Sequence, residues 1–231
     1  MRLTCALGLG LSIAAASAAC SDRQAVDPAV PAAVVAPAAP PVVSARPRIV
    51  CLGDSLTAGY GVSSDEAYPA QLAARLRAAG FDYEVANAGV SGDTSAGGLR
   101  RLDWSMVGDV QVLVVALGAN DGLRGLPPKD LRANLARIIE TAQARHVRVV
   151  LAGMEAPPNF GATYTRDFRA VYRDLAQTYD VTLVPFFLEG VAGVPSLNQA
   201  DGIHPTAEGQ RIVAATIWRA VAPLVGVRAS S

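Results

Sequence analysis

The chain has 231 residues, of which 51% are hydrophobic and 17% charged, so it is long enough for one well-filled domain and too apolar to be disordered throughout. Its 20 basic and 20 acidic residues give a formal net charge of zero. Without an excess of positive charge or a basic run, the chain is not expected to bind nucleic acid.

The first twenty residues, MRLTCALGLGLSIAAASAAC, have the pattern of a secretory signal peptide. One arginine precedes an apolar stretch, which gives way to small residues ending at Cys20. A buried first helix of the domain is the alternative, but the Pro/Ala-rich tract that follows disfavours it. Residues 21–47 are therefore predicted to be an extended, semi-rigid linker, and residues 48–231 the folded domain.

Cys20 follows AASAA, which resembles a bacterial lipoprotein signal that is cleaved just before a cysteine that becomes lipidated. Ser17 departs from this pattern, because such signals usually carry leucine there. Cleavage after the A-x-A-like residues 16–18 is the alternative and would release a soluble exported protein. An unpaired Cys20 thiol would be a liability in an oxidising compartment. The expected location is therefore periplasmic, with attachment to a membrane through lipidated Cys20.

The remaining cysteines predict no disulfide in the exported domain. Cys5 leaves with the signal peptide, and Cys51 lies inside an apolar run where it should be buried. Buried Cys51 is expected to act as a small hydrophobic residue.

From residue 48 onward, short β-rich runs alternate with amphipathic segments. Strands are predicted at 48–52, 83–88, 110–117, 147–154 and 181–186. Helical patterns lie at YPAQLAARLRAAG, SAGGLRRLDWSM, PKDLRANLARIIETAQAR, TRDFRAVYRDLAQTYD and PTAEGQRIVAATIWRAVAPLV. Continuous apolar strands separated by helices imply a parallel sheet covered on both faces. The predicted fold class is α/β, a three-layer α/β/α sandwich with a five-stranded parallel sheet.

Polar or glycine-rich loops follow four of these strands. GDSLTAGYG follows the first, GVSGDTS the second and GANDG the third, and the loop after the fifth ends in DGIHP. Ligands of such sheets bind outside the carboxyl ends of the strands, near the point where strand order reverses. The four loops are therefore predicted to form one site.

Ser55, at the end of the first strand, is the candidate nucleophile of this site. A serine hydroxyl needs a base, usually a histidine oriented by a carboxylate. His204 follows Asp201 by three residues, so one loop can present both side chains, with Nδ1 toward Asp201 and Nε2 toward Ser55. A plain helix entry capped by Asp201 or Thr206 is the alternative. His146, which precedes the fourth strand at the opposite edge, is expected to be structural.

Acyl transfer also needs hydrogen-bond donors for the developing oxyanion. The backbone N–H groups of Ser55 and Gly92 and the side chain of Asn120 are the candidates. Gly92 could equally be a turn residue, and Asn120 or Asp121 a helix cap.

Four of these residues match, in order, the four blocks of the SGNH hydrolases, also called the GDSL family: Ser55 in GDSL, Gly92 in VSGDTS, Asn120 in GAND and His204 in DGIHP. The chain resembles that family over nearly all of 48–224. NAGVSGDTS, LGANDGLRG and VPFFLEGV are most similar to its branch of arylesterases and acyl-CoA thioesterase/lysophospholipases.

The resemblance implies a flavodoxin-like SGNH hydrolase fold and a catalytic triad of Ser55, His204 and Asp201. It also implies an oxyanion hole from Ser55, Gly92 and Asn120, with no metal or organic cofactor. Asp54 is expected to shape the site without attacking the substrate. The loop EAPPNFG differs from some thioesterase members, which leaves substrate preference open.

Three other classes of protein fit less well. A phosphotransfer enzyme using Asp54 would want a second acidic residue two positions away, but positions 52 and 56 are leucine, and the only lysine is Lys129. A non-catalytic envelope lipoprotein would not need the serine, histidine and asparagine together. An α/β-hydrolase would carry its serine in G-x-S-x-G on a later strand, and that motif is absent.

Within the hydrolases, the main alternative is a carbohydrate O-acetylesterase acting on envelope polysaccharide. Apolar residues expected at the pocket rim favour acyl chains over sugars: Leu123, Leu126, Phe160 and Phe187. The expected substrates are therefore small acyl esters, thioesters or lysolipids.

Overall fold

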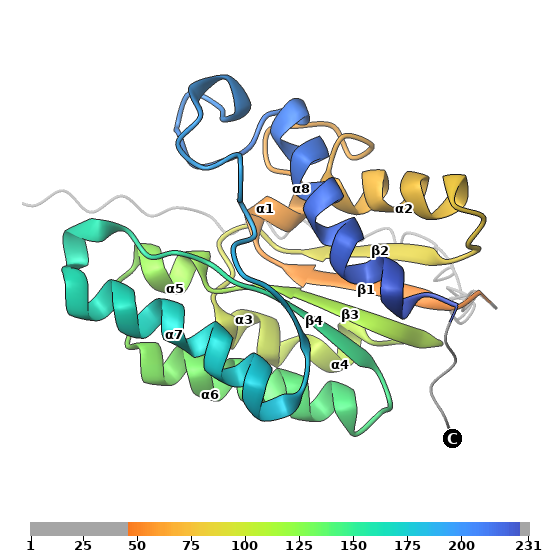
Figure 1. Ribbon diagram of the computed structural model, residues 1–231, viewed down its shortest axis with the longest axis horizontal. Coiled ribbons are helices and arrows are strands. Elements are labelled where there is room, and N and C mark those ends of the chain that lie inside the picture. Colours follow the sequence, from red (N-terminus) through yellow and green to blue (C-terminus); the bar gives the residue numbers. More distant parts are fainter. Residues whose placement is uncertain (1–45, 227–231) are drawn as a thin grey trace, which may run out of the picture. The chain divides into compact units, whose positions relative to one another are not determined.

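The computed structural model describes residues 46–226, drawn in colour in Figure 1. The predicted signal peptide, Cys20 and nearly all of the predicted linker lie outside the described residues. Within the described part, five parallel strands form one sheet in the order β2-β1-β3-β4-β5. The strands are β1 (Arg48–Gly53), β2 (Glu84–Gly89), β3 (Val110–Ala116), β4 (Arg148–Ala152) and β5 (Thr182–Val184).

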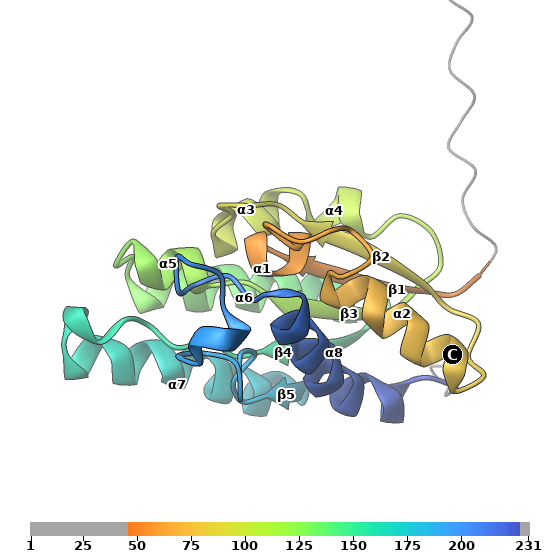
Figure 2. The ribbon, with the colours of Figure 1, turned by 90° about the horizontal axis from the view of Figure 1, so that it is seen from above.

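Helices cover both faces of this sheet. In Figures 1 and 2, α2 (Tyr68–Ala78) and α8 (Ala207–Val221) lie on one face. The other face carries α3 (Ser95–Arg100), α4 (Leu102–Ser105), α6 (Pro128–Gln143) and α7 (Ala162–Tyr179). Short α1 (Ser55–Ala58) and α5 (Ala119–Leu123) follow β1 and β3 directly, and the 3-10 turns are Pro158–Phe160, Pro195–Leu197 and Ala222–Leu224. The predicted three-layer α/β/α sandwich is confirmed.

Two predicted elements differ from the structure. The fifth strand has only three residues, Thr182–Val184, and beyond it the regular pairing with β4 is lost: Gly153 donates to the carbonyl oxygen of Val184 but accepts the N–H of Phe187. The predicted helix SAGGLRRLDWSM is divided into α3 and α4 at Arg101, whose backbone dihedrals of φ −107° and ψ 9° are not helical.

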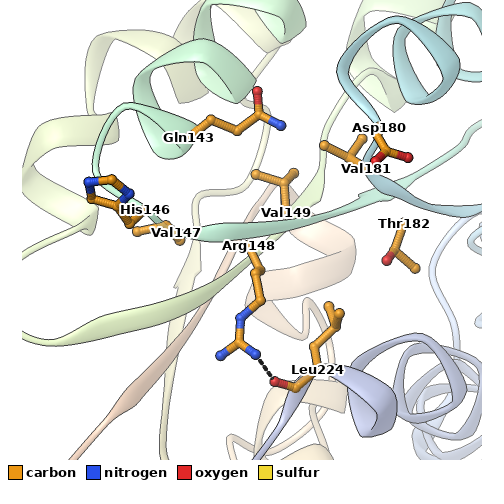
Figure 3. A pocket seen from close by; sticks show the side chains of 9 residues that line it. All are labelled: Gln143, His146, Val147, Arg148, Val149, Asp180, Val181, Thr182 and Leu224. Atoms are coloured by element: carbon orange, nitrogen blue, oxygen red, sulfur yellow. Dashed lines mark hydrogen bonds between the residues drawn. The ribbon is translucent and has the colours of Figure 1, made fainter. Parts of the chain in front are cut away.

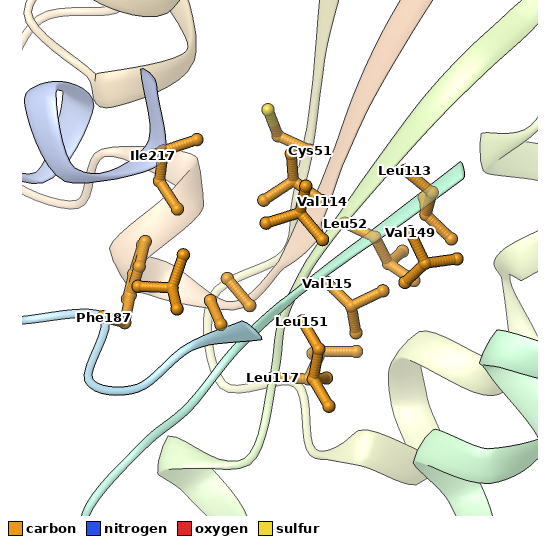
Figure 4. Close-up of a cluster of buried hydrophobic side chains, with 14 of the residues drawn as sticks. Cys51, Leu52, Leu113, Val114, Val115, Leu117, Val149, Leu151, Phe187 and Ile217 are labelled. Carbon is orange, nitrogen blue, oxygen red and sulfur yellow. The ribbon is translucent and has the colours of Figure 1, made fainter. Parts of the chain in front are cut away.

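The central strands form the core. Residues 49–52 of β1 and 112–115 of β3 are fully buried. In Figure 4, Cys51 and Val114 lie on the same side of the sheet as Ile217 of α8, while Leu52 and Val115 project to the opposite side. Helices meet these side chains with a matching apolar stripe, as α6 does with Leu131, Leu135, Ile138, Ile139 and Ala142.

Cys51 is buried and unpaired, as expected. Its burial raises the pKa of the thiol to about 12, so the group stays neutral and packs as a hydrophobic side chain.

The order of strands fixes where a ligand can enter. The chain passes from β1 to β2 on one side and then crosses to β3 on the other side of β1. Connections from β1 and β3 therefore leave in opposite directions at their carboxyl ends, which opens a crevice there. Among the helices of residues 46–226, none combines the length and apolar character needed to cross a membrane.

Candidate active site

Ser55 is raised out of the end of β1 by a tight strand-to-helix turn. Asp54 caps α1, its carboxylate accepting the N–H of Leu56 at 3.0 Å, and Ser55 is the first helical residue. A Cβ atom on Gly53 would lie 2.0 Å from Oγ1 of Thr57 and 2.8 Å from the carbonyl oxygen of Ala116. Only glycine fits where the strand turns so sharply, and this turn exposes the serine hydroxyl at the crevice.

His204 and Asp201 form a hydrogen-bonded chain with this hydroxyl. Nε2 of His204 lies 2.9 Å from Oγ of Ser55, and Nδ1 lies 2.6 Å from Oδ2 of Asp201. Oδ1 of Asp201 accepts the backbone N–H groups of His204 and Ile203 at 3.0 and 2.9 Å. The hydrogen bond from the His204 ring and these two backbone bonds lower the pKa of Asp201 to about 2. The carboxylate is therefore charged and can keep the Nδ1 proton in place.

The loop that carries His204 is held at both ends. The carbonyl oxygen of His204 accepts the N–H of Gln199 at 2.7 Å, and the Gln199 side chain donates to the carbonyl oxygens of Tyr60 at 2.7 Å and Pro205 at 3.0 Å. The rings of Tyr60 and His204 are 4.6 Å apart. These contacts join the loop to the segment after α1, so the imidazole keeps its orientation toward Ser55.

Gly92 and Asn120 lie beside the serine. A pocket of about 260 Å³ is lined by Ser55, Leu56, Tyr60, Ser91, Gly92, Ala119, Asn120, Leu123, Ile203 and His204. Gly92 has φ +83°, a conformation that favours glycine. Within residues 46–226, the backbone N–H groups of Ser55 and Gly92 have no hydrogen-bond acceptor. Both are therefore free to bind an oxygen atom of a substrate.

Asn120 is oriented by its neighbours. Its Nδ2 donates to the carbonyl oxygen of Asp93 at 3.0 Å and lies 3.4 Å from Oδ2 of Asp54. Asp121, the next residue, accepts the N–H and the hydroxyl of Ser95 at 2.8 and 2.6 Å, which ties α5 to α3. The first turn of α5 therefore holds the Asn120 amide at the pocket.

Asp54 lies behind the site. It is 1% exposed, and desolvation raises its pKa from the ordinary 3.8 to about 6, against the lowering effect of its bonds with Leu56 and Asn120. Because the carboxylate is covered and is engaged in capping α1, it is not available to accept a phosphoryl group. This finding removes the phosphotransfer alternative.

A second cavity continues from the first. It has a volume of about 390 Å³ and shares Leu56, Ala119, Leu123 and Ile203 with the serine pocket. Beyond them it is lined mainly by apolar residues: Met154, Ala156, Pro157, Pro158, Phe186, Leu188 and Ala192, with Glu155, Asn198 and Gly202. We call this cavity the apolar groove.

Of the four predicted rim residues, Leu123 alone lines the serine pocket or the apolar groove. Phe187 is 1% exposed and packs edge-on against Tyr68, with ring centroids 5.4 Å apart, so it belongs to the core. Its neighbour Phe186 lines the groove instead. Leu123 lines both cavities, whereas Leu126 and Phe160 are exposed and line neither.

Sequence reasoning missed several groove residues. Leu56 and Ile203 are direct neighbours of Ser55 and His204, and that adjacency was an available signal. Met154 and Leu188 come from segments with no polar motif, so nothing in their local sequence separated them from core residues.

His146 lies where the sequence predicted it, away from the serine. Figure 3 shows a pocket of about 350 Å³ lined by Gln143, His146, Val147, Arg148, Val149, Asp180, Val181, Thr182 and Leu224. These residues cluster at the amino-terminal ends of β4 and β5, and the His146 ring and the Asp180 carboxylate lie well apart. His146 is therefore not a partner of Ser55.

No cluster of three or more histidine, cysteine, aspartate or glutamate side chains suited to a metal ion occurs among residues 46–226.

Fold and geometry together fit one class of enzyme, the hydrolases that attack an ester carbonyl with a serine at the end of a strand. The sequence profile of the GDSL-like Lipase/Acylhydrolase family matches residues 51–212. The chain belongs to this family and is a hydrolase of ester bonds, and the resemblance to the SGNH hydrolases is confirmed.

Its relatives bear names from the same branch. Esterase TesA of Pseudomonas aeruginosa is 43% identical over 79% of this chain and 91% of that protein. The arylesterase of Vibrio mimicus is 40% identical over 74% of this chain and 86% of its own length. Thioesterase 1/protease 1/lysophospholipase L1 of Escherichia coli is 38% identical over 79% and 86%.

Solved structures agree with these relationships. A crystal structure of TesA has a TM-score of 0.74 and 42% identity, covering 78% of this chain and all of that one (100%). The psychrotrophic esterase EstA from Pseudoalteromonas sp., in a structure inhibited by monoethylphosphonate, has a TM-score of 0.73 and 31% identity, covering 78% and 99%.

Proposed function

We propose that this protein is an exported serine esterase acting on esters and thioesters of apolar acyl groups, including arylesters, acyl-CoA and lysophospholipids. The observation that carries the proposal is the unbroken chain Asp201–His204–Ser55 opening on an apolar groove. The names of the relatives support the same range of substrates.

In the proposed mechanism, Ser55 attacks the carbonyl carbon while Nε2 of His204 accepts the hydroxyl proton. Asp201 keeps the opposite ring nitrogen protonated and stabilises the imidazolium. The N–H groups of Ser55 and Gly92 bind the oxyanion, and Asn120 joins them by exchanging its long contact with Asp54 for the substrate oxygen.

The rest of the cycle returns each proton to its place. His204 donates its proton to the departing alkoxide or thiolate, which leaves an acyl group on Ser55 Oγ. A water molecule then attacks the acyl carbon while His204 takes its proton, and His204 passes that proton to Ser55 Oγ as the bond between Oγ and the acyl carbon breaks. The products are a carboxylic acid, the alcohol or thiol, and the regenerated serine.

The lining of the apolar groove favours an acyl chain over a sugar. Each methylene buried there contributes about 0.8 kcal/mol. The polar side chains of the groove are already engaged: Asn198 donates to the carbonyl oxygens of Val191 and Val194, and Glu155 pairs with Arg169. Few groups remain to bind sugar hydroxyls, so carbohydrate O-acetylesterase activity is the second candidate.

A substrate panel and an active-site label test this function together. Wild type should hydrolyse p-nitrophenyl esters, acyl-CoA and lysophospholipids faster than acetylated sugars, and a fluorophosphonate should label it but not Ser55→Ala. Activity confined to acetylated sugars would favour the second candidate. No labelling and no hydrolysis would indicate a non-catalytic lipoprotein. EDTA should leave the rates unchanged, as expected for chemistry without a metal.

We also propose that the mature protein is anchored by a lipid on Cys20, with the Pro/Ala-rich linker as a tether. AASAA before the cysteine supports cleavage there, and several acyl chains hold a protein firmly to a bilayer. Cells expressing wild type and Cys20→Ser should show membrane-bound and soluble protein respectively. A soluble wild type with an unmodified N-terminus by mass would exclude the anchor.

A further inference from the structure

Arg101, at the junction of α3 and α4, points back to the carboxyl ends of the strands. Its Nε donates to Oδ2 of Asp93 at 2.6 Å, Nη1 to the carbonyl oxygen of Ala88 at 2.7 Å and Nη2 to that of Gly53 at 2.7 Å. The side chains of Arg101 and Asp93 are 21% and 18% exposed. One guanidinium thus joins three separate segments in a largely covered position.

Each of these acceptors lies within four residues of a candidate oxyanion donor. Gly53 ends β1 two residues before Ser55, and its carbonyl oxygen also accepts the N–H of Val90 at 3.0 Å. Ala88 lies at the end of β2 and leads into the loop that carries Gly92. Asp93 directly follows Gly92.

Asp93 extends the network to the third donor. Its carboxylate receives the Arg101 guanidinium, while its carbonyl oxygen accepts Nδ2 of Asn120 at 3.0 Å. Arg101 is therefore linked, directly or through Asp93, to the Ser55 turn, the Gly92 loop and the Asn120 amide. Arg101 does not line the pocket that contains Ser55, so its influence on a substrate is indirect.

We propose that Arg101 is a positioning residue that sets the geometry of the oxyanion hole. This inference rests on the function proposed above. Oxyanion contacts are strongest in the transition state, so their displacement lowers kcat more than it raises KM. Three acceptors in different directions require the planar fork of arginine, which the single ammonium of lysine does not reproduce.

The test compares Arg101→Met with Arg100→Met, which removes the same charge from the exposed neighbouring residue. With a p-nitrophenyl ester, Arg101→Met should lose roughly 10²-fold in kcat, as for one oxyanion donor, with KM within about threefold. Arg100→Met should match wild type. Arg101→Lys should recover only a small part of the loss, whereas added guanidinium, well below denaturing concentrations, should partly restore kcat to Arg101→Ala.

If Arg101→Met does not fold, Asp93→Asn takes its place, because it weakens the ion pair and keeps the Asp93 carbonyl and two Arg101 bonds. It should lower kcat by a smaller factor at unchanged KM. A folded variant with wild-type kcat, or one with raised KM alone, would overturn the positioning role. If the positioning role fails while wild type is active and Ser55→Ala is inactive, the proposed function still stands. Equal rates for wild type and Ser55→Ala would overturn both proposals.

Discussion

The carboxyl ends and the amino ends of the strands each hold a pocket and a histidine, but only the carboxyl ends bring together the groups that a serine hydrolase needs. The pocket at the amino-terminal edge is the larger, at about 350 Å³ against about 260 Å³ around Ser55. His204 bridges a hydroxyl and a charged carboxylate, whereas the His146 ring has no hydrogen bond to another residue within 46–226. Pocket size and the presence of a histidine therefore do not identify the site, and convergent polar partners do.

The difference follows from what the loops do at each edge. His146 and Asp180 are the two non-glycine residues of the described part with positive φ, at 58° and 50°, and they reverse the chain after α6 and α7. Histidine and aspartate tolerate this conformation better than most residues. The need to reverse the chain thus explains why these two residues are polar. The loops at the carboxyl ends of the strands instead supply groups that converge on the pocket around Ser55.

Removing each histidine in turn should separate the two ends of the strands most clearly. His204→Ala and Ser55→Ala should each lower ester hydrolysis by roughly 10⁴–10⁶-fold, because nucleophile and base act as a unit. His146→Ala should retain wild-type kcat/KM. Near-normal activity in folded Ser55→Ala, or a large loss in His146→Ala, would contradict the assignment of the edges.

Asn120→Ala tests the carboxyl edge with a smaller change. Losing one oxyanion donor should cost roughly 10²–10³ in kcat with a modest effect on KM. Asn159→Ala, which removes an exposed amide, is the matched control. Equal rates for the two variants would show that Asn120 is only a structural amide.

Asp54 allows the same edge to be probed through stability. The pKa of Asp54 in the folded protein, about 6, exceeds the ordinary 3.8. The stabilisation that comes from burying the protonated carboxyl is therefore fully present below pH about 4 and is lost as the pH rises through about 6. Two pKa units correspond to about 3 kcal/mol. The free energy of unfolding of wild type, relative to Asp54→Asn, should fall by about this amount between pH 4 and 7 in urea titrations. A constant difference would show that burial does not perturb Asp54.

The pH profile of activity gives the smallest expected effect. His204 must be neutral to accept a proton, so kcat/KM should fall steadily as the pH is lowered into the acid range. The pKa of Asp201, about 2, keeps that carboxylate charged throughout this range. His146→Ala should show the same profile as wild type. Constant activity down to pH 4.5 would exclude an imidazole base.

Much of the architecture was predictable because it depends on local patterns. Apolar runs separated by amphipathic segments predicted all five strands and the three layers. The loops with Ser55, Gly92, Asn120 and His204 were predicted to converge because parallel strands present their carboxyl ends at one edge. The structure brings those four residues to one pocket, with Asp201 bonded to His204.

The remaining features depend on contacts between distant segments. Phe186 and Phe187 are adjacent, and only the end of β5 at Val184 decides which ring enters the groove and which joins the core. In the sequence, Arg101 is one of two adjacent arginines, Arg100 and Arg101, in a predicted helix. Its role depends on the carbonyl oxygens of Gly53 and Ala88, 48 and 13 positions away, whose approach no local pattern reports.

Ser55 and His204 are 149 positions apart in the sequence, and this separation has a consequence for biosynthesis. A growing polypeptide carries the proposed nucleophile from the end of the first strand onward, yet it can hold all five strands and still lack the proposed base, which comes just before α8. On the proposed mechanism, every fragment that ends before Asp201 should therefore be inactive toward esters. Recovery of activity after dilution from denaturant should accordingly report the joining of the Asp201–His204 loop to Ser55, because a sheet formed without that contact gives no signal in this assay.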